Sequence, residues 1–112
     1  MIRNSLLIES TEDYVGLWTI PRQLYLYSEE KDEFAVRRKT IQIIEELLND
    51  ELIQPGQFKD RKFEFWKLSP VETIARIEAE WDALGREPNI GEIVWFIATE
   101  KGEREVNLLR QK

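Results

Sequence analysis

The sequence contains no histidine and no cysteine, and these two absences exclude several kinds of chemistry at once. Without cysteine there are no disulfides, no thiol nucleophiles and no thiolate ligands for a metal. Without histidine, neither a Ser-His-Asp nor a Cys-His triad can be built, and the most versatile acid–base group at neutral pH is missing. Ordinary zinc sites also lack both of their usual ligand types. We therefore expect a protein that is not an enzyme and that uses no metal or other cofactor.

Glycine is scarce as well, and its five occurrences are scattered. They are Gly16, Gly56, Gly85, Gly91 and Gly102. Phosphate-binding loops need closely spaced glycines ahead of a helix, and neither the GxGxxG nor the Walker A pattern is present. No apolar run approaches the roughly 18 residues that cross a membrane, and Glu9 ends the N-terminal run too early for a signal peptide. We expect a cytoplasmic protein with no membrane partner.

What the chain does contain fits a single globular domain over residues 1–112. Apolar residues make up 42% of the sequence and include four Trp, five Phe and three Tyr, which is enough for a core without disulfides or metal. The formal net charge is −6. An acidic surface repels the phosphates of nucleic acids and favours association with a more basic protein.

Two long helices have clear sequence signals. Ser69 is a predicted N-cap, proline follows at the first helical position, Glu72 completes a capping box, and Gly85 ends the helix. The other helix runs from about residue 33 to residue 50. Its predicted apolar face consists of Phe34, Ile41, Ile43, Ile44, Leu47 and Leu48.

Two further helices have weaker signals. Ser10 or Thr11 is a predicted cap for a helix over the apolar segment 14–27, and we predict that Pro21 kinks this helix rather than dividing it in two. Thr99 is a predicted cap for a last helix over about residues 100–110. The chain therefore has four predicted main helices.

Three extended segments complete the secondary-structure prediction. Residues 52–54 form a predicted short strand that Pro55 and Gly56 stop, and residues 63–66 form a second short piece. Residues 92–98 form the best strand, and apolar side chains alternate to both of its faces. A strand that is apolar on both faces should be covered on both, by helices or by a second subunit.

This order of elements resembles the winged-helix pattern. A long helix runs directly into Leu52-Ile53, and the later strand ends in Thr99-Glu100-Lys101-Gly102-Glu103, a turn and closing helix similar to those that follow the second wing strand in that family. The resemblance implies an α+β fold with four main helices, a small antiparallel sheet and, unlike the family, a helix inserted between the wing strands. Gly16-Leu17-Trp18 and the segment 81–96 are also similar to an uncharacterised family of small bacterial proteins, which has no established activity.

Two groups of residues are candidate contacts for a partner or a nucleic acid. Arg37, Arg38 and Lys39 lie near the start of the long helix, where a recognition helix meets base edges. Basic and aromatic residues alternate over the segment 58–67, as they do on surfaces that bind single strands. The candidates in this segment are Arg61, Lys62 and Trp66. Arg37 to Lys39 have an alternative interpretation as ion-pair partners, because an acidic protein offers many carboxylates.

Glu78 is the best single candidate for a perturbed acid. On the helical wheel it falls at the edge of the apolar face of the helix that begins after Ser69. Partial burial would raise its pKa and give it acid–base capacity. The alternative is an edge residue paired with Arg or Lys, since the sequence places no second carboxylate beside it.

The leading functional hypothesis is a non-enzymatic protein-binding module whose partner is another protein, for which the charge favours a basic one, or a second copy of itself. Immunity proteins that neutralise cationic toxins are one version of this hypothesis, by analogy. The alternative is a winged-helix transcription regulator that binds DNA, although the net charge disfavours nucleic acid. A carboxylate-dependent enzyme that uses Glu78 ranks third.

Overall fold

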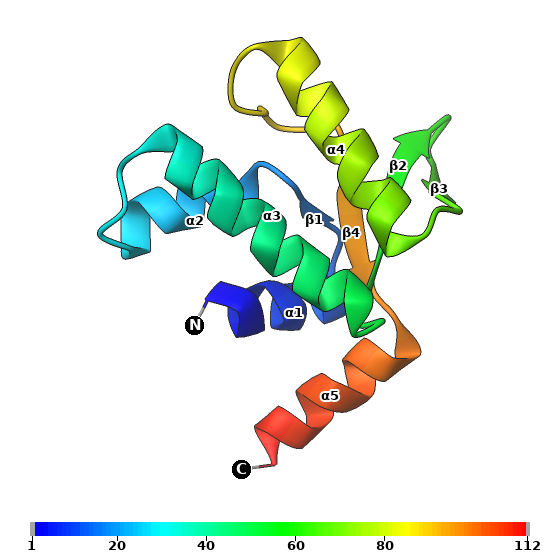
Figure 1. Cartoon of the computed structure of the whole chain (residues 1–112). Helices are drawn as coiled ribbons and strands as arrows, with labels where there is room; N and C mark the ends of the chain where they lie inside the picture. Colours follow the sequence, from blue (N-terminus) through cyan, green and yellow to red (C-terminus); the bar gives the residue numbers. More distant parts are fainter. Residues whose placement is uncertain (1, 112) are drawn as a thin grey trace.

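Five α-helices and a four-stranded antiparallel sheet account for most of residues 2–111, the part of the chain that the computed structural model describes (Figure 1). The helices are α1 (Ile2–Glu12), α2 (Thr19–Tyr27), α3 (Glu33–Asn49), α4 (Pro70–Leu84) and α5 (Glu100–Arg110). The strands are β1 (Val15–Gly16), β2 (Ile53–Lys59), β3 (Lys62–Phe65) and β4 (Trp95–Ala98). The predicted α+β class is confirmed, with one helix more than predicted.

The strand order in the sheet is β1-β4-β2-β3, and every neighbouring pair is antiparallel. The last strand in the chain, β4, therefore lies inside the sheet, where Phe96 is opposite Val15 on one side and Pro55 on the other. Helix α4 lies between β3 and β4 in the sequence, as predicted. Helix α3 packs against α2 and α4, and α5 leads away from β4 and packs against α1 (Figure 1).

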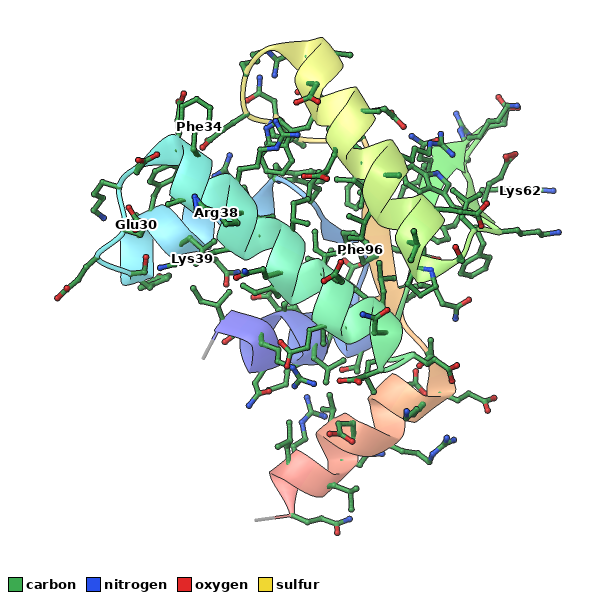
Figure 2. All side chains as sticks on the ribbon, viewed as in Figure 1. Glu30, Phe34, Arg38, Lys39, Lys62 and Phe96 are labelled. Carbon is green, nitrogen blue, oxygen red and sulfur yellow. The ribbon has the colours of Figure 1, made fainter. Side chains whose placement is uncertain are left out.

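The core draws on every helix and on the inner face of the sheet, and Phe96 lies at its centre with no exposed surface (Figure 2). Its fully buried side chains include Leu6 and Leu7 of α1, Ile20 of α2, Val36, Ile44 and Leu47 of α3, Ile77 of α4 and Val106 of α5. The predicted apolar face of α3 is partly wrong. Phe34 is 73% exposed, because the buried face of α3 is centred on Val36, Thr40 and Ile44.

The predicted helix caps of the C-terminal half are confirmed. The hydroxyl of Ser69 accepts a hydrogen bond from the backbone N–H of Glu72, whose carboxylate accepts one from the backbone N–H of Ser69. Gly85 ends α4 in the left-handed conformation, at φ 68°. The hydroxyl of Thr99 caps α5 and also donates to the carbonyl of Glu51 at 2.6 Å, which fixes the start of α5 beside the end of α3.

The prediction for the N-terminal segment is wrong. Ser10 and Thr11 are not N-caps but lie inside α1, where their hydroxyls donate to the carbonyls of Leu7 and Ile8 at 2.6 Å. Pro21 neither kinks nor divides a helix, because it lies in the first turn of α2, where the missing N–H breaks no helical hydrogen bond. The interruption comes earlier, at β1.

Two strand boundaries also differ from the prediction. Pro55 and Gly56 do not stop a strand, since β2 continues through both to Lys59 and pairs with β3 and β4. β4 begins at Trp95 rather than at residue 92, because Ile93 has a positive φ of 68° that is incompatible with a strand.

Candidate functional site

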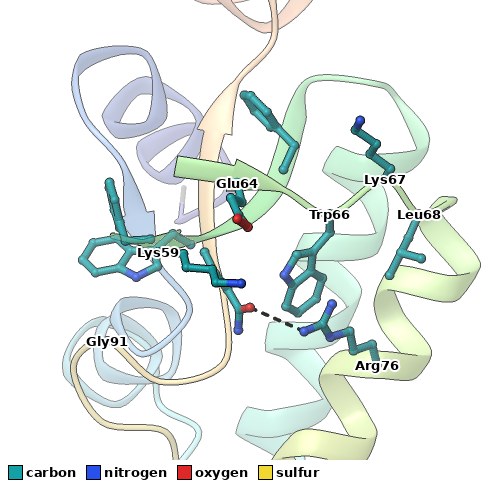
Figure 3. Close-up of a pocket in the computed structure, with 11 residues that line it drawn as sticks. Lys59, Glu64, Trp66, Lys67, Leu68, Arg76 and Gly91 are labelled. Atoms are coloured by element: carbon teal, nitrogen blue, oxygen red, sulfur yellow. Dashed lines mark hydrogen bonds between the residues drawn. The ribbon is translucent and has the colours of Figure 1, made fainter. Parts of the chain in front are cut away.

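A groove of about 850 Å³ lies beside the β2–β3 hairpin, between the hairpin and α4 (Figure 3). We call it the hairpin groove. Its lining consists of Gln57, Phe58, Lys59, Glu64, Phe65, Trp66, Lys67, Leu68, Arg76, Gly91 and Trp95. The groove thus brings together the hairpin, the segment that follows it, the middle of α4 and the loop before β4.

Trp66 and Arg76 form one wall of the hairpin groove. The guanidinium carbon of Arg76 lies 3.8 Å from the centre of the Trp66 ring, a cation–π contact. Arg76 also donates to the carboxylate of Glu80 at 2.7 Å and to the side-chain oxygen of Gln57 at 3.4 Å (Figure 3). The amide nitrogen of Gln57 donates to the carbonyl of Ile93 at 2.6 Å. These contacts connect α4, β2 and the loop before β4 around the groove.

The indole N–H of Trp66 is an unsatisfied donor. Trp66 is only 8% exposed, and its Nε1 atom has no hydrogen-bond acceptor among the described residues. A buried donor without a partner costs about 1–3 kcal/mol and is uncommon in folded proteins.

Aromatic rings form a continuous row over the outer face of the sheet, opposite the face that carries Gln57 and Glu64, and three of them, from Phe58, Phe65 and Trp95, border the hairpin groove. The row consists of Trp18, Trp95, Phe58, Tyr14, Phe63 and Phe65, with successive ring centres 4.5–5.2 Å apart. The rings share a face because Phe58 is paired with Phe63, and Gly56 with both Phe65 and Trp95. Phe58 and Phe65 are 45% and 48% exposed. The row is therefore a partly exposed apolar surface.

The loop on the other side of the groove contains a strained residue. Ile93 has a φ of 68°, in the left-handed region that a β-branched residue rarely adopts. Such a conformation costs on the order of 1–3 kcal/mol and persists where the surroundings enforce it. Here the side chain of Ile93 is buried and its carbonyl is held by Gln57.

The charged side chains that line the groove are mostly positive, whereas the protein as a whole is negative. Lys59, Lys67 and Arg76 line it together with a single carboxylate, Glu64. Within residues 2–111, Arg76 has an ion-pair partner, whereas Lys59, Lys67 and Glu64 have none. The groove is therefore a locally basic surface on a protein with a net charge of −6.

The structure brings three of the candidate residues into this region. Trp66 lines the groove, and Arg61 and Lys62 are exposed residues at the tip of the hairpin. Figure 2 shows Lys62 pointing away from the rest of the molecule. The tip is a two-residue turn in which Asp60 and Arg61 both have positive φ, 51° and 67°. This combination defines a type I′ turn, whose twist matches that of a hairpin.

The second basic group is not part of the groove. Arg37 is an ion-pair partner: it donates to the carboxylate of Asp82 at 2.7 Å and to the carbonyl of Glu78 at 3.2 Å, and its guanidinium lies 5.1 Å from the Trp81 ring centre. Arg37 therefore fastens α3 to α4. Arg38 and Lys39 are exposed on α3 (Figure 2), and the exposed face of α3 continues into acidic residues towards its end.

Glu78 does not occupy the environment that the helical wheel predicted. It is exposed on α4, and the contact that the structure gives it uses its main-chain carbonyl, which Arg37 binds. The prediction that Glu78 is partly buried, on which its candidacy as a perturbed acid depended, is therefore wrong. The buried face of α4 is made by Thr73, Ile74, Ile77 and Trp81 instead.

The loop that carries Gly91 is closed by a strong ion pair. Arg86 donates through two nitrogens to the two carboxylate oxygens of Glu92, at 2.7 and 2.8 Å, and the backbone N–H of Asn89 donates to the same carboxylate. The hydrogen bonds from Arg86 and then from Asn89 lower the pKa of Glu92 from 4.5 to about 2. The carboxylate thus remains ionised well into the acid range.

This pair makes stability depend on pH. Because the folded-state pKa of Glu92 is depressed, its contribution is fully present above about 4.5 and is lost as the pH falls through about 2. We expect the parent to be more stable than Glu92→Gln at neutral pH, and the difference to shrink over this window. Urea unfolding midpoints of both proteins across the pH range check this, and a difference that does not depend on pH would contradict it.

Among residues 2–111, no three His, Cys, Asp or Glu side chains gather in a group that could hold a metal ion. In the same part of the chain, no helix is both long enough and apolar enough to cross a membrane. Comparisons with protein-family models, with curated proteins and with solved structures find no match to this chain.

Proposed function

We propose that this protein is a non-enzymatic protein-binding module and that the hairpin groove, with the aromatic row beside it, binds the partner. The observation that supports this proposal is a locally basic groove that is bordered by the half-exposed rings of Phe58 and Phe65. Aromatic side chains anchor many protein interfaces because they bury a large area and lose little conformational freedom.

The charges suggest how the partner is recognised. Lys59 and Lys67 would attract an acidic side chain in the bound segment, placed between apolar groups that contact Phe58 and Phe65. The net charge of −6 acts at longer range and favours a partner that is basic as a whole. A basic protein that presents one acidic and apolar segment satisfies both requirements.

The groove offers little for catalysis. Its titratable side chains are two lysines, one arginine and one carboxylate, and its arginine is held by Glu80 and Gln57. Acid–base chemistry on a substrate usually needs two groups with separated pKa values, and nucleophilic chemistry needs a base beside the nucleophile. A binding role agrees better with this set of side chains.

We expect Phe65→Ser to reduce recovery of the partner by at least about tenfold, because loss of an aromatic anchor costs 2 kcal/mol or more at an interface. The measurement is a tagged pull-down from native lysate with nuclease treatment, quantified by mass spectrometry. Phe34→Ser is the matched control, since Phe34 is an exposed phenylalanine on α3, outside the groove. Equal recovery with Phe65→Ser and Phe34→Ser would contradict the proposal.

A second candidate function is DNA binding in the manner of winged-helix regulators. The observation that favours it is the direct succession of α3 and the β2–β3 hairpin, whose tip carries Lys59, Arg61 and Lys62. In this arrangement α3 would be the recognition helix and Arg38 would approach the bases. A gel shift at low salt that Arg38→Glu abolishes, together with pull-down material that nuclease removes, would favour this candidate over a protein partner.

A further inference from the structure

The strand β3 is an edge of the sheet, and the geometry of its turn shows which backbone groups are free. Lys59 and Lys62 flank the two-residue turn and therefore exchange hydrogen bonds with each other. Hydrogen-bonded and non-hydrogen-bonded pairs alternate along an antiparallel ladder. The N–H and C=O groups of Phe63 and Phe65 consequently point away from β2, toward the open edge.

The chain after β3 supports this assignment. Trp66, the next residue in the inward-pointing series, donates its backbone N–H to the carbonyl of Pro55 on β2 at 3.0 Å. Phe65 must then point outward, as the alternation requires. Within residues 2–111, no strand pairs with the outer edge of β3. The edge is therefore a free template for another strand.

The side chains of β3 carry one charge of each sign on the same face. Lys62 and Glu64 alternate with the phenylalanines and are both exposed, and neither has an ion-pair partner in the described part of the chain. Phe63 and Phe65 lie on the opposite face, at the end of the aromatic row. A lysine on an edge strand usually discourages pairing with another strand. On β3, however, the carboxylate of Glu64 lies two residues from Lys62 and can pair with the lysine of an added strand.

We propose that two copies of this chain associate by antiparallel pairing of their β3 strands about a two-fold axis at Phe63. The backbone N–H of Phe63 in each copy donates to the carbonyl of Phe63 in the other. Lys62 of each copy is then opposite Glu64 of the second copy, so that two ion pairs form across the axis. The two four-stranded sheets become one continuous sheet of eight strands.

The charges select this register over its neighbours. Lys62 and Glu64 form the non-hydrogen-bonded pairs of the new ladder, in which opposite side chains are closest. An axis at Glu64 would place two glutamates opposite each other, and an axis at Lys62 would do the same with two lysines. Like charges directly opposite are unfavourable. Only the axis at Phe63 pairs each charge with its opposite.

The aromatic row gives a second reason for a partner at this edge. In the proposed dimer the two Phe63 side chains are neighbours on the same face, so the rows of the two copies join across the axis. Phe65, which is half exposed in the single chain, gains cover there. The inference goes beyond the proposed function, because it concerns the backbone edge of β3 and a second copy of the chain, although Glu64 and Phe65 also line the groove.

The test uses the full chain and charge reversals in sedimentation equilibrium over a range of concentrations. For the parent we expect the mass to rise from 13.4 kDa toward twice that value. Lys62→Glu and Glu64→Lys each place like charges opposite each other, and each should raise the concentration at the midpoint of dimerisation at least about tenfold. The double variant, Lys62→Glu with Glu64→Lys, restores both pairs in reversed order and should dimerise like the parent.

Lys101→Glu is the matched control, because it changes the net charge as Lys62→Glu does but lies exposed on α5. It should dimerise like the parent. A parent mass that stays at 13.4 kDa up to about 1 mM would overturn the proposal. Dimers that resist both single reversals, or that the double variant does not restore, would also overturn it.

Discussion

Replacing Phe96 by alanine is expected to lower the free energy of unfolding by about 3–5 kcal/mol. The Phe96 side chain has no exposed surface and lies on an inner strand, paired with Val15 on one side and Pro55 on the other. Backbone on both sides of β4 is held by the ladder, so the cavity left by the ring cannot collapse fully. Since small domains have total stabilities of about 5–15 kcal/mol, this loss removes much of the fold's margin.

The measurement is urea unfolding followed by tryptophan fluorescence, with Phe34→Ala as the control. Phe34 is 73% exposed, so its truncation should change the free energy of unfolding by no more than about 0.5 kcal/mol. Similar losses for Phe96→Ala and Phe34→Ala would contradict the position of Phe96 at the centre of the core. The sequence placed both phenylalanines on predicted apolar faces, whereas in the structure Phe96 is buried and Phe34 is exposed.

The helix caps could be predicted because each depends on residues three positions apart in the chain. The capping box of Ser69 and Glu72 involves one helical turn, and so does the hydrogen bond from the backbone N–H of Gly102 to Thr99. Ser10 shows the limit of such signals. A serine inside a helix can satisfy its own hydroxyl by donating to a carbonyl one turn earlier, as Ser10 does with Leu7, and its sequence context then looks like that of a cap.

The strand boundaries could not be predicted because distant segments determine them. Proline usually ends or interrupts a strand. Here the carbonyl of Pro55 accepts a hydrogen bond from the backbone N–H of Trp66, and the strand that contains Pro55 is paired on both sides. Ile93 has the β-branched side chain typical of a strand, yet it adopts a left-handed conformation in which its carbonyl accepts a hydrogen bond from Gln57, far away in the sequence. In both cases the local propensity is overridden by tertiary contacts.

The candidate site was predictable only in part. Basic and aromatic alternation singled out Arg61, Lys62 and Trp66, which do lie at or beside the groove. The residues that shape the groove around Trp66 gave no signal, because Gln57 and Arg76 are ordinary surface residue types until the fold stacks or bonds them there. The unsatisfied indole N–H is likewise a property of the packed structure alone.

The second large effect is expected for Gly56→Ala, which should destabilise the protein by about 3 kcal/mol, the upper end for overpacking. A Cβ atom at position 56 would lie 2.5 Å from the carbonyl oxygen of Glu64 and 2.5 Å from the ring of Phe63. The carbonyl belongs to the backbone of β3 and cannot move aside without breaking the β2–β3 ladder. The substitution should therefore separate the two strands of the hairpin.

Gly91→Ala is the control, because a Cβ at position 91 meets no atom within 4 Å and is opposed only by a positive φ, which costs about 1–2 kcal/mol. Urea unfolding gives the stability of both variants, and amide hydrogen exchange over residues 57–65 reports on the hairpin. Gly56→Ala should lose protection there, whereas Gly91→Ala should keep it. Unchanged protection in Gly56→Ala would contradict the close approach of the strands. Since the groove and the β3 edge both depend on that approach, this variant should also abolish partner recovery and dimerisation together.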